Sequence, residues 1–233
     1  MKIIRACDRH FSDQGWLKTF WLFSFSDYYD PDNLRHGTLR VFNDDIVEPG
    51  EGFGTHPHKE MEIVTIVLSG EITHTDSMGN AHSLKAGEVQ RMSAGTGITH
   101  SEFNRSTEPL HLYQIWIIPD TSGLTPTYEQ KAFDPDGSMN NLLPVVSGMG
   151  MEGALSIHSD SSIYISKLEA ENGLTYEADG GRAIFIYLTS GTIEVNGERL
   201  GVCDQARLIV EGETELAISA VEESSFVLID LPS

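Results

Sequence analysis

The chain consists of short apolar runs that Gly and Pro interrupt before any run reaches the length of an ordinary helix. These runs are rich in Val, Ile, Phe and Tyr, and the clearest span 62–68, 110–118, 183–189 and 225–231. Turn sequences such as 77–80 and Asn196-Gly197 separate them. Helical periodicity is nowhere sustained, and frequent short strands are typical of β-sandwiches and barrels. The sequence therefore predicts an all-β fold.

Two parts of the chain resemble each other. In residues 66–72 and again in 186–193, an apolar strand runs into a Gly and a second strand follows. A hairpin turn comes next in both cases. This similarity predicts a duplicated β unit, and 233 residues are enough for two domains of about 100 residues each.

The expected linker is the polar segment 120–137, which contains Pro and Gly. It divides the chain into a first domain at 1–119 and a second at 138–233.

The charge balance restricts the possible partners. The chain has 35 acidic and 15 basic residues, for a net charge of -20. Such a field repels nucleic acid and anionic membrane surfaces, and no run of about 18 apolar residues could span a bilayer. The first residues lack a secretory signal, and two cysteines are too few for a disulfide framework. We expect a cytoplasmic protein that binds neither nucleic acid nor membrane.

Two short motifs predict a metal site. His56 and His58 flank Pro57, and alternate residues of an extended chain share one face. About forty residues later, His100 and Glu102 repeat this spacing. If the two strands are neighbours in a barrel, their four side chains converge on one point inside it. Three imidazoles and a carboxylate suit Fe, Mn, Co, Ni, Cu or Zn, and we expect one divalent ion, with iron preferred.

The sequence around these motifs resembles the pirin family and its bacterial quercetinase relatives. The matching segments are Phe25-Ser26-Asp27-Tyr28-Tyr29-Asp30-Pro31, Leu39-Arg40-Val41-Phe42-Asn43-Asp44-Asp45, Thr55-His56-Pro57-His58, Met61-Glu62-Ile63-Val64-Thr65, Asp76-Ser77-Met78-Gly79-Asn80, residues 87–97 and His100-Ser101-Glu102-Phe103-Asn104. The resemblance implies two cupin barrels in tandem, each a double-stranded β-helix or jelly roll. It also implies His56, His58, His100 and Glu102 as metal ligands.

Two carboxylates compete for the fourth ligand position. Cupins in general often use a Glu four residues after the second His, which here is Glu62. The pirin pattern uses the Glu two residues after the third His, which here is Glu102. We favour Glu102 as ligand and expect Glu62, on the same strand face as His56 and His58 by parity, to hold a ligand in place.

The resemblance implies quercetin 2,3-dioxygenase activity, in which a flavonol ring is cleaved with O2 and carbon monoxide is lost. The substrate would be a small enolic or aromatic molecule, with Glu102 as the general base. Phe53, Met92 and Gln114 are candidates for lining the cavity. The alternative is a non-enzymatic regulator, since pirin itself is associated with redox-dependent binding of a protein partner.

Other residues receive structural interpretations. We expect His74 and His82, on either side of a hairpin turn, to lie on the surface. Five aromatic residues are expected to pack in the core or between the domains: Trp16, Phe20, Trp21, Phe23 and Phe25. Counting back from Gly191 as from Gly70 places Glu177 and Asp179 where the first domain has His56 and His58. We therefore expect no metal in the second domain.

Overall fold

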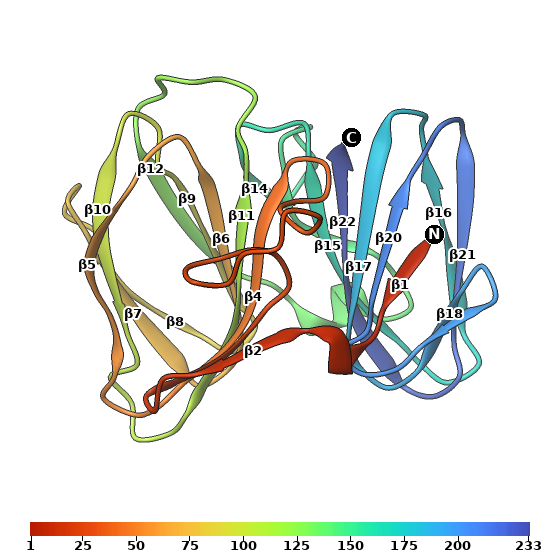
Figure 1. The fold of residues 1–233 in the computed structure, drawn as a ribbon, viewed down its shortest axis with the longest axis horizontal. Coiled ribbons are helices and arrows are strands. Elements are labelled where there is room, and N and C mark those ends of the chain that lie inside the picture. The colour runs from red at the N-terminus through yellow and green to blue at the C-terminus, as the bar shows by residue number, and fades with distance from the viewer.

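The computed structural model describes residues 1–233 and contains twenty-two strands and two short 3-10 helices, Ala6–Asp8 and Pro135–Ser138. Figure 1 shows two β-barrels side by side, with the N-terminal barrel on the left. The predicted all-β fold of two tandem barrels is confirmed. The strand runs read from the sequence at 62–68 and 110–118 correspond to β6 and β11, whose bounds follow.

A seven-stranded and a four-stranded sheet form the first barrel. The larger has the order β12 (Thr127–Ala132), β9 (Glu88–Ser93), β6 (Glu62–Ser69), β11 (Leu110–Ile117), β4 (Leu39–Val47), β3 (Leu17–Trp21) and β2 (His10–Asp13). The smaller has the order β5 (Gly52–His58), β10 (Ile98–Phe103), β7 (Glu71–Asp76) and β8 (Ala81–Lys85).

The second barrel has the same division into sheets. Its larger sheet has the order β1 (Lys2–Ile4), β20 (Gln205–Ile209), β17 (Arg182–Ser190), β22 (Ser224–Pro232), β15 (Ser162–Leu168), β13 (Leu143–Ser147) and β14 (Leu155–Ser156). Its smaller sheet has the order β16 (Gly173–Ala178), β21 (Thr214–Ala220), β18 (Ile193–Val195) and β19 (Glu198–Leu200). The matching order supports the duplication.

Two strands lie where the expected domain bounds do not place them. β1 falls within the range 1–119 but pairs with β20, and Figure 1 shows the N-terminus beside the second barrel. β12 falls within the expected linker 120–137 but extends the first sheet by pairing with β9. Both are short edge strands, so their pairing depends on an available sheet edge that local sequence does not reveal. The bounds themselves stay a prediction.

The two large sheets pack face to face around a shared core of 21 buried residues. Phe42 of β4 contacts Phe185 and Tyr187 of β17, with ring centroids 5.2 and 4.9 Å apart. In β6 and β11, the residues facing this core alternate with residues that face the interior of the first barrel, as the period of a strand requires. Each large sheet is thus buried on both sides.

The interiors of the two barrels differ in polarity. Sixteen buried apolar residues fill the second barrel. In the first barrel, two small apolar clusters of seven and four residues lie apart, and buried polar side chains occur as well, including His74, Gln90, His100 and Glu102. The buried histidines thus lie in the interior of the first barrel, whereas a large apolar cluster fills that of the second.

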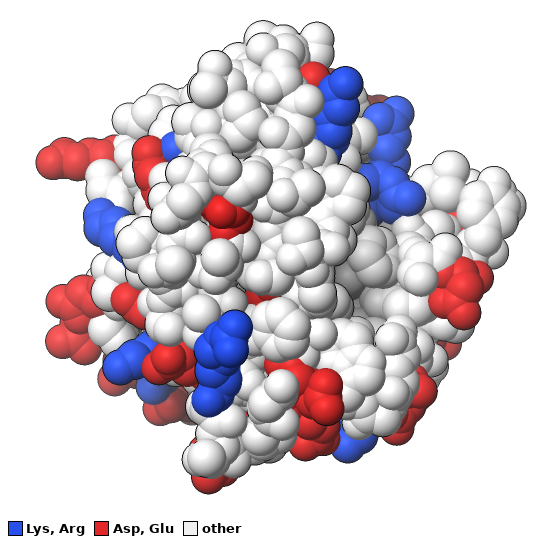
Figure 2. Space-filling view, turned by 90° about the vertical axis from the view of Figure 1, so that its left-hand side faces the viewer, with Lys and Arg blue, Asp and Glu red and all other residues white.

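On the outer face of the first barrel, seen in Figure 2, Asp and Glu side chains lie mainly around the margin and much of the centre is uncharged. No helix of the chain has the length and apolar character needed to cross a membrane.

Candidate metal centre

The two predicted ligand strands are neighbours. β5 and β10 pair antiparallel, with His100 opposite His56 and Ile98 opposite His58. Along β5, His56 and His58 are partly buried while Thr55 and Pro57 are exposed. The alternation predicted for an extended His-x-His segment is therefore present, and all three imidazoles face the barrel interior.

The three imidazoles form one cluster. One nitrogen from each of His56, His58 and His100 lies within 4.8 Å of the others, and the two Nε2 atoms of His56 and His100 are 3.0 Å apart. Two nitrogens that bind one ion at about 2.1 Å and at right angles lie about 3.0 Å apart. The facing ring nitrogens therefore fit a shared divalent cation.

The surroundings keep two of these rings neutral. Burial lowers the pKa of His58 to about 4 and that of His100 to about 3, and neighbouring imidazoles contribute in the same direction. Neutral imidazole is the form that binds a metal, because the ligand needs a free lone pair. At neutral pH both rings can act as ligands.

The Glu102 carboxylate lies beside the cluster and is only 2% exposed. Its Oε1 accepts a hydrogen bond from Gln90 Nε2 at 2.5 Å, and its Oε2 accepts one from Gln114 Nε2 at 3.0 Å. Glu102 groups by distance with His74 and His100 rather than with all three predicted histidines. The two amides fix the carboxylate while leaving lone pairs on both oxygens.

His74 is fully buried, which corrects the surface position expected from the sequence. Its Nε2 lies 3.0 Å from Asp76 Oδ2, and its Nδ1 lies 3.4 Å from Nδ1 of His100. His74 thus contacts the side of the His100 ring that faces away from His56. The strand period, which places His74 on the same face as the apolar Ile72, could have indicated this position. His82 is exposed, as expected.

Glu62 does not lie where strand parity places it. Its Oε2 accepts a hydrogen bond from the Ser93 hydroxyl at 2.7 Å. Burial raises the pKa of Glu62, and His158 of the second half of the chain is one of its neighbours. The extended conformation is interrupted between the end of β5 at His58 and the start of β6 at Glu62, where Glu60 has a φ of +49°. The alternation of faces along β5 therefore does not continue into β6. Glu62 lies on the same face of β6 as Val64 and Ile66, which belong to the interdomain core.

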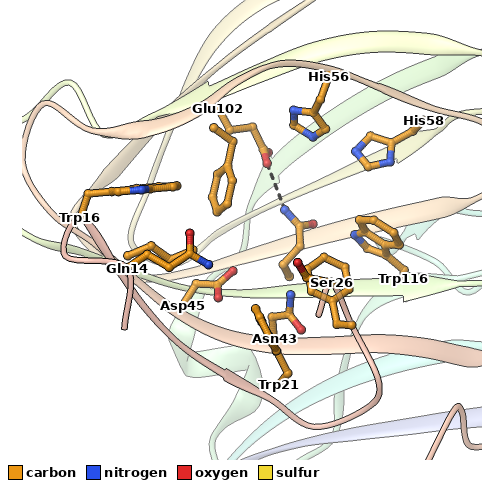
Figure 3. A pocket seen from close by; sticks show the side chains of 14 residues that line it. Gln14, Trp16, Trp21, Ser26, Asn43, Asp45, His56, His58, Glu102 and Trp116 are labelled. Carbon is orange, nitrogen blue, oxygen red and sulfur yellow. Dashed lines mark hydrogen bonds between the residues drawn. The ribbon is translucent and has the colours of Figure 1, made fainter. Parts of the chain in front are cut away.

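A cavity of about 280 Å³ opens beside the imidazoles. Figure 3 shows His56, His58 and Glu102 on one side of it, with Asp45 and Asn43 across from them. Five of its fourteen lining residues are Trp or Phe: Trp16, Trp21, Phe25, Phe53 and Trp116. Its volume is at the small end of ligand pockets, which hold about 300–1,000 Å³.

Several lining residues differ from the sequence expectations. Phe53 and Gln114 line the cavity as expected, but Met92 packs with Ile63 and Ile98 instead. Trp16 and Trp21 were expected only to pack, and they line the cavity together with Phe25. Phe20 and Phe23 do pack at the interdomain core.

Asp45 also lines the cavity and was not among the residues predicted from the sequence. It is 2% exposed, and burial raises its pKa to about 7. Its Oδ1 has no hydrogen-bond partner. The only sequence signal was its place in the segment 39–45, where alternate residues of a strand would face one side.

The second barrel has no comparable centre. Glu177 and Asp179 are exposed, while Tyr176 and Ala178, which alternate with them, face the interior. The two residues predicted to occupy the positions of His56 and His58 in the second barrel thus face outward.

Fold and site together define a class: a two-barrel cupin protein with one histidine-rich centre, in the N-terminal barrel. Comparison with known families agrees, because the pirin family matches residues 4–117 and the quercetinase C-terminal cupin domain matches residues 144–231. The quercetin 2,3-dioxygenase of Escherichia coli (strain K12) is 43% identical over 229 residues, which are 98% of this chain and 97% of the relative. A pirin-like protein of Caulobacter vibrioides is 40% identical over 94% of both chains.

Solved structures show the same relationship. The crystal structure of YhhW from Escherichia coli superposes with a TM-score of 0.94 at 42% identity, covering 99% of this chain and 97% of that one. Bacterial pirin YhhW in complex with nickel(II) superposes with a TM-score of 0.93 at 41% identity, covering 99% and 98%. The chain belongs to the pirin family, which supports the predicted class of quercetinase-like oxidoreductase.

Proposed function

We propose that the protein is a metal-dependent dioxygenase that opens the ring of a flavonol or a related enolic aromatic molecule with O2. The observation that carries the proposal is the position of the imidazole cluster at the wall of an aromatic cavity. Flat aromatic substrates pack well between Trp and Phe rings. The name of the Escherichia coli relative, quercetin 2,3-dioxygenase, points to the same substrate class.

We assign His56, His58, His100 and Glu102 as ligands of one divalent transition metal. Iron is our preferred ion, and the nickel(II) complex of a relative supports a divalent metal at this kind of site. When bound, the metal acts as a Lewis acid that lowers the pKa of the substrate hydroxyl.

The chain itself would bind, orient and deprotonate the substrate. Trp16, Trp21 and Phe25 exclude water from the ring. The Glu102 carboxylate, held by Gln90 and Gln114, accepts the proton of the 3-hydroxyl group. The resulting enolate reacts with O2, and both oxygen atoms enter the opened product as one carbon leaves as carbon monoxide.

Oxygen uptake tests the proposal. Quercetin added to the metal-loaded protein should consume O2 and release carbon monoxide in equal amounts, and His56→Ala should do neither. If the protein is fully loaded with each first-row divalent ion in turn and consumes no O2 with any of them, the proposed dioxygenase activity is contradicted. Metal-dependent capture of a protein partner would then favour the regulatory alternative.

A further inference from the structure

The cavity has a second polar region, across from the histidines. Asp45 and Asn43 on β4, together with Gln14, contribute polar side chains to this part of the wall. Asp45 Oδ1 and Asn43 Oδ1 are both buried and have no hydrogen-bond partner. A strand places residues 43 and 45 on the same face, and both residues line the cavity. Asp45 Oδ1 is enclosed by the protein beside the equally unpaired hydroxyl of Thr19 on β3, so the other carboxylate oxygen is the one that can meet a ligand.

Leaving a carboxylate in this state is unfavourable for folding. Burial without a partner costs a polar group free energy, and a charged group more. The neighbouring Asp44 shows what a satisfied carboxylate looks like in this fold, since it accepts from His111 at 2.6 Å and from Tyr187 at 2.7 Å. Because the Asp45 carboxyl group lines the cavity and no protein group donates a hydrogen bond to its Oδ1, a ligand in the cavity is the available donor for its other oxygen.

We propose that Asp45 accepts a hydrogen bond from a hydroxyl group of the substrate at the end remote from the metal, and so determines substrate specificity. The preferred substrates are then flat aromatic molecules with hydroxyl groups at two ends, one for the metal and one for Asp45. This inference rests on the proposed function, because it uses the same cavity and the same orientation of the ring.

The tryptophans of the protein provide a direct probe. The chain has three, and Trp16, Trp21 and Trp116 all line the cavity. Quenching of their fluorescence therefore reports occupancy of the cavity itself. Measured without O2 in the metal-loaded protein, it gives affinities that are independent of turnover.

The test compares two flavonols. Quercetin carries hydroxyl groups on both ring systems, whereas 3-hydroxyflavone keeps only the metal-binding hydroxyl. At pH 8, above the Asp45 pKa of about 7, the carboxylate is mostly charged. Hydrogen bonds to charged groups contribute about 1.5–3 kcal/mol, so the wild type should then prefer quercetin roughly 10- to 100-fold. Asp45→Leu, of similar size, should reduce the preference to within about threefold, and Asp45→Asn should lie between, because a neutral acceptor bonds more weakly. Asp179→Leu, an exposed position in the second barrel, is the matched control and should keep the preference.

The outcomes separate the two proposals. If Asp45→Leu and Asp45→Asn keep the full preference for quercetin, the inference is overturned, whether or not the protein turns the flavonols over. If the preference depends on Asp45 but no flavonol consumes O2 in air, the inference stands and the dioxygenase proposal fails. If neither flavonol quenches the wild-type fluorescence, both are overturned.

Discussion

Both ring nitrogens of His100 face another histidine, and this arrangement fixes the orientation of the imidazole. Nε2 faces His56 and Nδ1 faces His74, whose other nitrogen lies near Asp76. Partners behind a ligand hold its ring in place and set its tautomer. The site is therefore larger than the four proposed ligands and includes the buried pair of His74 and Asp76.

The two candidate carboxylates can be separated by matched substitutions. Glu102→Gln removes the charge and the basicity but keeps the size, so metal affinity should weaken and flavonol turnover at saturating metal should fall at least about 100-fold. Glu62→Gln should leave both nearly unchanged, because Glu62 contacts Ser93 on the interdomain side. Metal titration and oxygen uptake measure the two effects. The opposite ranking would show that Glu62 is the ligand.

Asp45 should make stability depend on pH. Burial raises its folded-state pKa to about 7 from 3.8. Between these values the unfolded chain releases a proton that the folded chain keeps, so stability falls as pH rises from about 4 to 7 and is then level. Asp45→Asn removes this loss. The unfolding free energy of Asp45→Asn should therefore be higher than that of the wild type. This difference should increase with pH up to pH 7 and reach at most about 4 kcal/mol.

Urea unfolding between pH 5 and pH 8 measures this difference, with Asp179→Asn as the exposed control. A constant difference between Asp45→Asn and the wild type across this range would contradict the assigned burial effect.

The spacing of residues made part of this site predictable. Alternate residues of a strand share one face, so His56 lies on the same face as His58, and His100 on the same face as Glu102. The prediction also required that the two strands be neighbours, and β5 and β10 are paired. His74 and Asp45 were not found, because a buried polar residue has the same letter in the sequence as an exposed one. Only the strand face and the contacts from other strands distinguish them.

The loop of residues 22–38, between β3 and β4, links the cavity to the second barrel. Near its start, Phe25 and Ser26 line the cavity. Arg207 of β20 donates from Nη2 to the Leu22 carbonyl and from Nη1 to Asn33 Oδ1, both at 2.8 Å. Its guanidinium carbon lies 4.0 Å from the Phe23 ring centroid. The second barrel therefore holds the loop that completes the cavity wall.

Removing this contact should affect both stability and substrate binding. Arg207→Leu leaves the Asn33 amide oxygen without its donor and the Leu22 carbonyl with only its second donor, Asn33 Nδ2. This loss should lower the unfolding free energy by roughly 2–4 kcal/mol. The KM for a flavonol should rise while metal content stays the same. Arg35→Leu, exposed on the same loop, is the control. An unchanged KM in a destabilised Arg207→Leu protein would limit the role of Arg207 to folding.

The elements themselves followed closely from local sequence. The apolar runs at 183–189 and 225–231 correspond to β17 and β22 within one residue at either end. The pairing of β1 with β20 did not follow, because Lys2–Ile4 is too short to show a pattern and its partner lies about 200 residues away. Local sequence determines which segments are extended, whereas the sheet edge that remains free determines where a short strand pairs.

In the whole molecule, two barrels of the same topology have different interiors. The first has a polar region with a cavity, whereas a cluster of sixteen buried apolar side chains occupies the interior of the second. The shared core of 21 residues joins them, and the net charge is -20. The sequence predicted the duplication and the difference in metal-binding residues, but not that the second barrel would support the cavity of the first through Arg207.

The most direct test of this account is the metal content of the purified protein, measured by elemental analysis together with oxygen uptake on quercetin. We predict one divalent ion per chain in the wild type. The Glu177→Ala/Asp179→Ala protein should keep this ion and its oxygen uptake, while the His56→Ala/His58→Ala protein should lose most of both and remain folded. Stoichiometric metal in the double-histidine variant, or a second ion that disappears with Glu177 and Asp179, would contradict the single centre in the first barrel.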